Sequence, residues 1–194
     1  MRTARDPGQR AAHLAGAVQH VLREGVATLS LRPLAAALGT SDRMLLYYFG
    51  TRDDLLAAVL DTVGEQLQAG LTAALPDGPV PPDRLLPALW ASLEDAGAEA
   101  HVRLYLEVSG LAARGRQPFA DLAQRVAEDW LTWVGPRLDV PDDERAAAAA
   151  GLLAALDGVL LVDAVAGRER ARAAAGWLSG RLAGSGQVGG AVPG

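Results

Sequence analysis

The chain has 194 residues, half of them hydrophobic, which is enough for one large domain or for a small domain joined to a larger one. It contains no Cys, so disulfides, thiolate catalysis and Cys-based zinc sites are excluded. The net charge of −5 is uneven: residues 1–60 carry seven Arg and five acidic residues, whereas residues 61–194 carry eleven Arg and eighteen acidic residues. A mildly basic N-terminal quarter therefore precedes an acidic body.

The composition favours helices. Ala and Leu are abundant, β-branched runs are few, and no segment alternates between apolar and polar residues as a half-buried strand would. We therefore expect an all-α fold of about nine helices. The first is predicted from Gln9 to Glu24, where apolar side chains recur on one face and Gly25 ends the pattern.

Two short helices and a tight turn come next. Ser30 is a good N-cap for a helix over residues 31–38, which Gly39 ends. A turn over residues 39–41 leads into a third helix, roughly 42–48. This arrangement is a helix-turn-helix, which places the N-terminal residues of its second helix toward base edges in the DNA major groove.

A capping box of the form T-x-x-D, Thr51–Asp54, predicts the start of a longer fourth helix. The Pro-rich segment 75–83 ends that helix and is the clearest boundary in the chain. Five further helices are expected near residues 83–96, 98–113, 118–138, 142–166 and 168–183. These elements predict a DNA-binding domain over 1–52, a helical ligand-binding and dimerisation domain over 53–183, and a disordered tail over 184–194.

The stretch "TLSLRPLAAALGTSDRMLLYYFGTRDDLL", residues 28–56, resembles the N-terminal DNA-binding domain of TetR-family transcriptional regulators. The resemblance extends from the first helix to the start of the fourth. It implies that Phe49 packs into the core of the small domain and that Tyr48 meets a DNA phosphate. It also implies that Arg52 faces a phosphate at the N-terminus of the fourth helix, where exposed amides and the helix dipole favour an anion.

One position departs from the family pattern. The family's commonest phosphate-contacting Tyr corresponds here to Leu46, and Asp42, Asp53 and Asp54 lie close by in the sequence. We therefore expect fewer neutralised phosphates and a shallower dependence of DNA affinity on salt. The neighbouring Tyr47 is a candidate to take over the missing contact.

The candidate DNA contacts lie on the two short helices and their flanks. Arg43 is the best candidate for base readout, because its guanidinium can hold guanine with two hydrogen bonds. Arg2, Arg5 and Arg10 form either an arm on the DNA or a solvated tail. The full set of candidates is Ser30, Arg32, Ser41, Asp42, Arg43, Met44, Tyr47, Tyr48 and Arg52.

The body offers candidates for a small-molecule pocket. His101 and Tyr105 are four residues apart on one predicted helix, and they form either an ordinary half-exposed face or the polar side of a pocket. Trp90, Trp130 and Trp133 are either core residues or pocket walls. No metal site or cofactor is expected, because His13 and His20 are seven residues apart and lack a third ligand.

The last two predicted helices, 142–166 and 168–183, are long, apolar and rich in Ala and Gly. They form either the central core or a subunit interface, and the resemblance implies the interface of a homodimer. Charged residues follow their longest apolar run too closely for a membrane span, so a cytoplasmic protein is expected.

The expected function is a homodimeric repressor that a small, mostly apolar effector releases from a palindromic operator. The alternative is a small-molecule-binding module with weak or vestigial DNA binding. No hydrolase, protease or phosphate-loop motif is present, so an enzyme is not expected.

Overall fold

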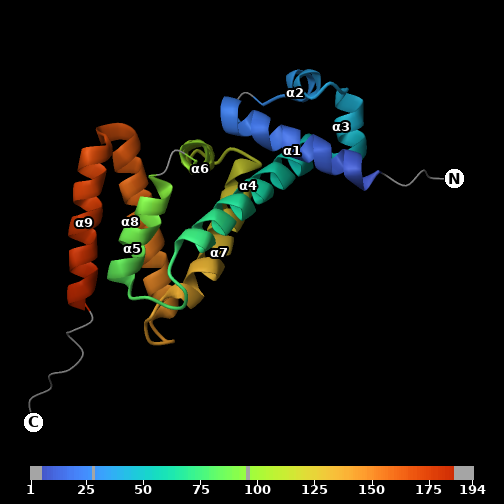
Figure 1. Ribbon diagram of the computed structural model, residues 1–194. Coiled ribbons are helices and arrows are strands. Elements are labelled where there is room, and N and C mark those ends of the chain that lie inside the picture. The colour runs from blue at the N-terminus through green and yellow to red at the C-terminus, as the bar shows by residue number, and fades with distance from the viewer. Residues whose placement is uncertain (1–5, 28, 95–96, 186–194) are drawn as a thin grey trace, which may run out of the picture. The chain divides into compact units, whose positions relative to one another are not determined.

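The computed structural model describes residues 6–27, 29–94 and 97–185. Within these ranges the chain forms nine α-helices, one short 3₁₀ helix and no strand, so the expected all-α fold is confirmed (Figure 1). The elements are α1 (Pro7–Glu24), α2 (Leu31–Ala37), α3 (Asp42–Phe49), α4 (Arg52–Ala74), α5 (Pro82–Leu93), α6 (Glu99–Ala113), α7 (Phe119–Val134), η1 (Gly135–Arg137), α8 (Arg145–Ala166) and α9 (Arg168–Ser185).

The predicted helix over 118–138 was wrong at its C-terminal end. The α-helix α7 stops at Val134, and η1 carries Pro136, which has no amide to continue the helical hydrogen bonds. Leu138 then forms an isolated parallel bridge with Val80. The predicted disordered tail over 184–194 falls almost entirely outside the described residues, as do Arg2 and Arg5.

The helices group into two compact units whose boundaries fall inside α4 and α7. The head unit combines residues 1–69 with 100–126, and the bundle unit combines residues 70–99 with 127–194. Packing thus assigns α6 and the first half of α7 to the same unit as the helix-turn-helix. The predicted domain boundary at Arg52 stays a prediction.

The core of the head unit joins the helix-turn-helix to α1. Leu34 of α2 and Leu45 of α3 are fully buried beside Val18 of α1. Gly16 of α1 makes room for the α2 C-cap, because a Cβ there would lie 2.5 Å from Leu38 Cδ2. Leucines of the two short helices therefore pack on the first helix.

A carboxylate of α6 holds the C-terminal end of α1. Glu107 accepts hydrogen bonds from the Val26 amide (3.0 and 3.1 Å) and the Ala27 amide (2.7 Å). One turn earlier on α6, Arg103 donates to the Leu22 carbonyl at 2.9 Å. Two amides just after this helix and one carbonyl in its last turn therefore find their hydrogen-bond partners in side chains of one distant helix.

The close approach of Glu107 requires glycine at position 25. Gly25 has φ 80° and ψ −173°, a conformation that is open almost only to glycine. A Cβ at this position would also lie 2.5 Å from Glu107 Oε2. The residue that ends α1 is thus also the residue that admits the carboxylate.

The capping box at the start of α4 forms as predicted. Thr51 Oγ1 accepts a hydrogen bond from the Asp54 amide at 3.0 Å. Asp54 Oδ2 in turn accepts from the Thr51 amide at 3.0 Å and from the Thr51 hydroxyl at 2.8 Å. These hydrogen bonds, the one from the hydroxyl first, lower the pKa of Asp54 below its ordinary value.

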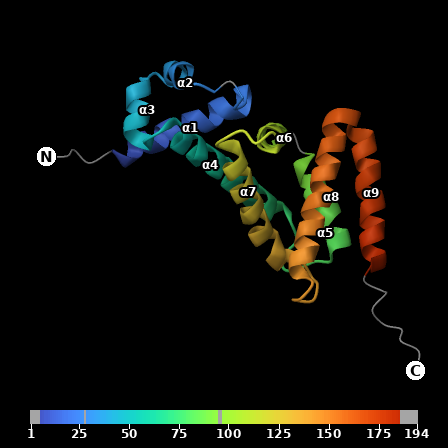
Figure 2. The ribbon, with the colours of Figure 1, turned by 180° about the vertical axis from the view of Figure 1, so that it is seen from behind.

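In the bundle unit α5 packs against α8 and α9, and these three helices lie side by side in Figures 1 and 2. Arginines brace the chain between the helices: Arg145 donates to the carbonyls of Gly135 (3.2 Å), Leu138 (2.7 Å) and Val140 (3.3 Å).

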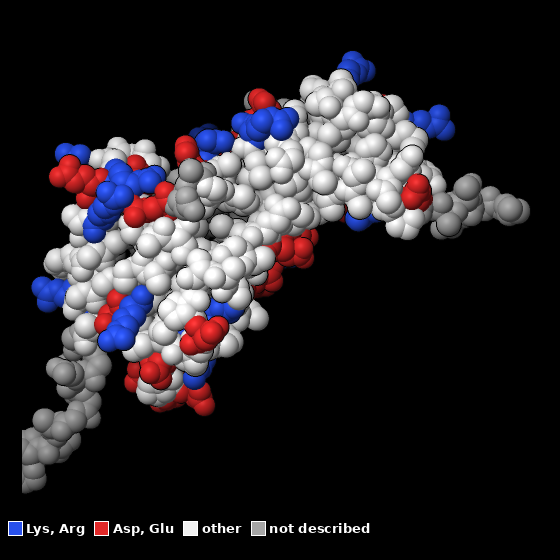
Figure 3. Space-filling view, viewed as in Figure 1, with Lys and Arg blue, Asp and Glu red and all other residues white. Residues whose placement is uncertain are grey.

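Near the α8–α9 turn, Arg168 pairs with Asp163 at 3.1 Å and also donates to the Glu94 carbonyl at 3.2 Å. Arg172 pairs with the Glu94 carboxylate at 2.7 Å. Figure 3 shows positive and negative side chains intermixed around this turn.

We predict that Glu107→Gln lowers the stability of the head unit by about 1–3 kcal/mol, because a charge-assisted acceptor is replaced by a neutral amide. Gly25→Ala should cost a similar amount through backbone strain. The measurement is amide hydrogen exchange at Val26 and Ala27 together with urea unfolding. Glu65→Gln, an exposed change on α4, is the control, and equal effects of both Glu variants would contradict the role of Glu107.

A second prediction concerns pH. Because the folded state lowers the pKa of Asp54, its contribution to stability is complete above about pH 4 and disappears as the pH falls through the lower, folded-state pKa. Asp54→Asn should therefore lower the unfolding midpoint at pH 7 and match the wild type in strong acid. Unfolding curves from pH 2 to 7 check this, and a pH-independent difference would refute it.

Candidate nucleic-acid interface and apolar cavity

The reading helix α3 divides cleanly into a buried and an exposed face. Leu45, Tyr48 and Phe49 are buried, with 0%, 6% and 8% of their surface exposed. The remaining residues of the helix face outward: Asp42, Arg43, Met44, Leu46 and Tyr47. This division follows the 3.6-residue period and gives α3 the exposed face that a reading helix needs.

Two of the predicted DNA contacts cap α3 itself. Ser41 is the N-cap, and its Oγ accepts a hydrogen bond from the Met44 amide at 3.2 Å. Asp42 Oδ1 accepts from the Arg43 amide at 2.9 Å. Asp42 thus extends the cap, and the helix dipole favours its charge there.

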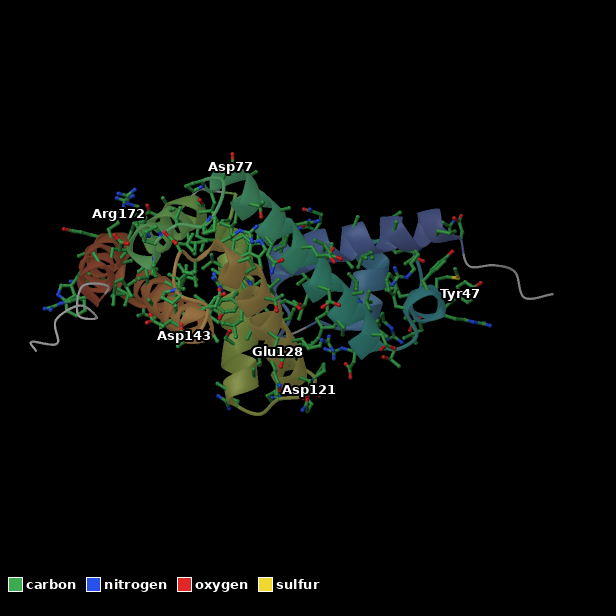
Figure 4. The ribbon with its side chains drawn as sticks, turned by 90° about the horizontal axis from the view of Figure 1, so that it is seen from below. Tyr47, Asp77, Asp121, Glu128, Asp143 and Arg172 are labelled. Atoms are coloured by element: carbon green, nitrogen blue, oxygen red, sulfur yellow. The ribbon has the colours of Figure 1, made fainter. Side chains whose placement is uncertain are left out.

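The two neighbouring tyrosines have different environments. The ring of Tyr48 is buried against His13 of α1, with ring centroids 5.4 Å apart, and its hydroxyl donates to Gln9 Oε1 at 2.7 Å. Tyr47 is 42% exposed and meets Tyr48 edge to face at 5.1 Å. Figure 4 shows Tyr47 at the surface of α3.

The guanidinium of Arg52 is engaged within the head unit. Its Nε and Nη2 donate to the Leu29 carbonyl at 3.2 and 2.8 Å, and its Nη1 pairs with Asp53 at 3.3 Å. Arg52 therefore links the start of α4 to the segment before α2, and 38% of its side chain stays exposed.

The other predicted contacts lie at the start of α2. Ser30 is its N-cap but makes no side-chain capping hydrogen bond, so the hydroxyl is not used by the helix. Arg32 is exposed in the first turn. Together with α3 these residues bring every predicted DNA contact onto α2, α3 and the N-terminus of α4.

Sequence reasoning missed the partners that fix this surface from outside the motif. Gln9 holds the Tyr48 hydroxyl, and the Arg10 guanidinium lies 4.9 Å above the ring of Phe49. A polar residue and a cation on one face of the first helix, as Gln9 and Arg10 are, give no distinctive signal before the packing is known.

The predicted pocket residues are divided between the two units. His101 and Tyr105 lie half-buried on α6 in the head unit, whereas the three tryptophans lie in the bundle unit. Among these, Trp130 and Trp133 meet edge to face at 5.1 Å. Trp90 is 5% exposed, and its Nε1–H has no hydrogen-bond acceptor among the described residues.

Trp130 lines a small apolar cavity of about 10 Å³, enough for about one water. Trp133, by contrast, carries the Arg137 guanidinium 4.0 Å from its ring centre and donates from Nε1 to Thr72 at 3.2 Å. Burial lowers the pKa of Arg137. The other residues of the cavity wall are Leu89, Val134, Leu152, Leu153 and Leu156.

An apolar surface covers one side of α8 and α9. Leu161, Val165 and Trp177 are 54%, 75% and 62% exposed. On α8 the exposed residues continue at spacings of three and four, through Ala147, Gly151, Ala154, Gly158, Leu161 and Val165. By length and composition α8 could also cross a membrane, and 28% of its most apolar stretch of 18 residues is buried within the protein.

Within the described ranges no three His, Asp or Glu residues gather as metal ligands would. The exposed face of α3 has the arrangement of a helix that reads DNA, and the cavity beside Trp130 is lined by apolar side chains.

Comparison with known proteins agrees with this arrangement. Residues 14–59 match the family model described as bacterial regulatory proteins, tetR family. No curated protein matches the sequence. Among solved structures, a TetR-family transcriptional regulator from Cytophaga hutchinsonii aligns with a TM-score of 0.75 at 16% identity, over 95% of this chain and 98% of that one.

Two further structures align over similar lengths. A transcriptional regulator from Rhodococcus sp. Rha1 has a TM-score of 0.71 at 22% identity, over 91% of this chain and 96% of that one. The multidrug binding protein EbrR, complexed with proflavin, has a TM-score of 0.68 at 27% identity, over 90% and 99%. The N-terminal segment therefore matches the tetR family of bacterial regulatory proteins, and the chain shares its fold with these solved structures over about nine-tenths of its length.

Proposed function

We propose that this regulator is a homodimeric, cytoplasmic repressor that binds a palindromic operator and leaves it when a small, mostly apolar effector binds. The observation that carries the proposal is the exposed face of α3, which presents Arg43 at the start of a helix preceded by a tight turn. The absence of hydrolase, protease and phosphate-loop motifs from the sequence agrees with a binding protein rather than an enzyme.

For base readout we propose Arg43, Met44 and Tyr47, three exposed residues of the outward face. Ser30, the N-cap of α2, and Arg32 in its first turn are proposed to contact the DNA backbone at the edge of the groove. Ser41 and Asp42 contribute by capping α3, and the two amides that they engage are then unavailable to DNA.

The remaining two candidates are proposed as positioning residues in the free protein. Tyr48 is held by Gln9 and Arg52 by the Leu29 carbonyl. A DNA phosphate can still contact the exposed part of the Arg52 side chain. That contact would neutralise one more phosphate and so make the dependence of DNA affinity on salt steeper.

The dimer is proposed to form through the exposed apolar surface of α8 and α9. Small residues on α8 allow two helix backbones to approach closely, and Leu161, Val165 and Trp177 supply the apolar area that would be buried. A two-fold dimer also supplies the two reading helices, about 34–36 Å apart, that a palindrome requires.

The effector is proposed to enter the bundle unit beside Trp130. Because the cavity there holds only about one water, a larger ligand must displace the walls formed by α5, α7 and α8. A ligand that selects this displaced form removes the operator-binding form from the equilibrium. We propose that α4, which begins in the head unit and ends in the bundle unit, carries the change to the reading heads.

The proposal is tested by selecting purified protein on a random duplex library at near-physiological salt. Enrichment of a two-fold palindrome is the expected result and provides the operator for all later measurements. Folded, dimeric protein that enriches nothing would contradict the proposal.

The failure of that selection would favour a second function, a small-molecule-binding module with vestigial DNA binding. The specific observations behind it are Leu46 on the exposed face and the internal engagement of Arg52. Under that function the chain would bind apolar ligands while its DNA affinity stayed at the non-specific level.

We predict that Val165→Glu converts the dimer to a monomer, because it places a charge in a desolvated apolar interface. Sedimentation velocity measures the mass, with Gln66→Glu on the exposed side of α4 as a control for added charge. A variant that stays fully dimeric would remove this surface from the proposed interface.

We also predict that Trp130→Ala weakens binding of planar aromatic ligands at least tenfold, since stacking and burial against its ring are lost. Proflavin, the ligand in the EbrR complex, is a practical probe, with fluorescence polarisation as the readout. Trp133→Phe, whose ring lies under Arg137, should change the affinity by less than about threefold. The opposite order of effects would place the ligand elsewhere.

A further inference from the structure

The exposed face of α3 is unusually apolar for a surface that meets DNA. The described residues include six large hydrophobic side chains that are clearly exposed, and three of them, Met44, Leu46 and Tyr47, lie on this eight-residue helix. They are 36%, 38% and 42% exposed. Of these, only Tyr47 brings a polar group.

The same helix carries little positive charge. Arg43 is its only cation, and Asp42 precedes it. In Figure 3 the blue side chains over the helix-turn-helix are few and separated, without a continuous basic field on the visible face. Contacts other than ion pairs must therefore supply much of the discrimination between different DNA sequences.

The positions of these side chains fit the geometry of a groove. Met44 and Tyr47 are three residues apart and Arg43 and Tyr47 four apart, so the three form one continuous patch. Met44 lies in the first turn of α3, the part of a reading helix that reaches base edges. Its thioether is flexible and apolar, which suits contact with a small apolar group.

The major groove offers one apolar group, the 5-methyl of thymine, which sits next to the hydrogen-bonding edges of the bases. We propose that this regulator reads thymine 5-methyl groups in its operator through Met44 and Tyr47, beside a guanine held by Arg43. This inference rests on the proposed operator binding and names the chemical group that the reading helix recognises.

The test removes the methyl group from the DNA and leaves the protein unchanged. In the selected operator, each thymine is replaced by uracil at symmetric positions of both half-sites, which preserves every base pair. Affinity is measured by fluorescence anisotropy at constant salt. At one or two positions per half-site the replacement should weaken binding about fourfold for each methyl, and so about sixteenfold for the symmetric pair.

Two protein variants show which side chain is responsible for the loss of affinity on removal of the methyl group. Met44→Ala should weaken binding to the thymine operator and largely abolish the difference between thymine and uracil at one of the sensitive positions. Arg43→Ala is the matched control, because it should weaken binding to both operators and keep their ratio. Both side chains are exposed, so circular dichroism should show an unchanged fold.

The outcomes separate this inference from the proposed function. A palindrome with equal affinity for thymine and uracil at every position would overturn the inference and leave operator binding intact. Unchanged operator affinity in both Met44→Ala and Tyr47→Ala would also overturn it. If no palindrome is enriched, both proposals fail at the selection step.

Discussion

The conformation of the head unit depends on the carboxylate of Glu107. It accepts hydrogen bonds from the amides of Val26 and Ala27, just beyond the end of α1, and the partners lie about 80 residues apart in sequence. Because α1 carries the core against which α2 and α3 pack, Glu107 ties α6 to the helix-turn-helix, together with Arg103 and the buried Leu104 and Val108. Any motion of α6 must carry α1 with it or break these bonds, so α6 is mechanically part of the reading head.

The helix-turn-helix could be predicted from the sequence because its signals are local. Ser41, Gly50 and the Thr51–Asp54 box each act within four residues, and the structure forms them as the pattern indicates. The buried face of α3 follows the helical period in the same way. The predicted C-terminal end of α7 was wrong, by contrast. The apolar pattern continues through Pro136, but the helical hydrogen bonds cannot continue there because proline has no amide hydrogen.

The roles of individual side chains in the candidate site could not be predicted, because long-range contacts determine them. The helical period buries Tyr48 and exposes Tyr47, but the acceptor of the Tyr48 hydroxyl is Gln9, 39 residues earlier, which no local pattern indicates. The availability of Arg52 depends on the carbonyl of Leu29. The cavity beside Trp130 needs α5, α7 and α8 together, and no spacing within one helix specifies such a wall.

Arginine side chains hold backbone carbonyls throughout the molecule, among them Arg52, Arg103, Arg137, Arg145 and Arg168. The chain contains no Lys, and a guanidinium keeps its proton far into the alkaline range. A lysine in the same places would offer only a compact ammonium, without the planar fork of N–H donors with which Arg145 holds three carbonyls at once. Replacing these arginines by lysines would therefore keep the charge and lose most of the links between the helices and the connecting segments.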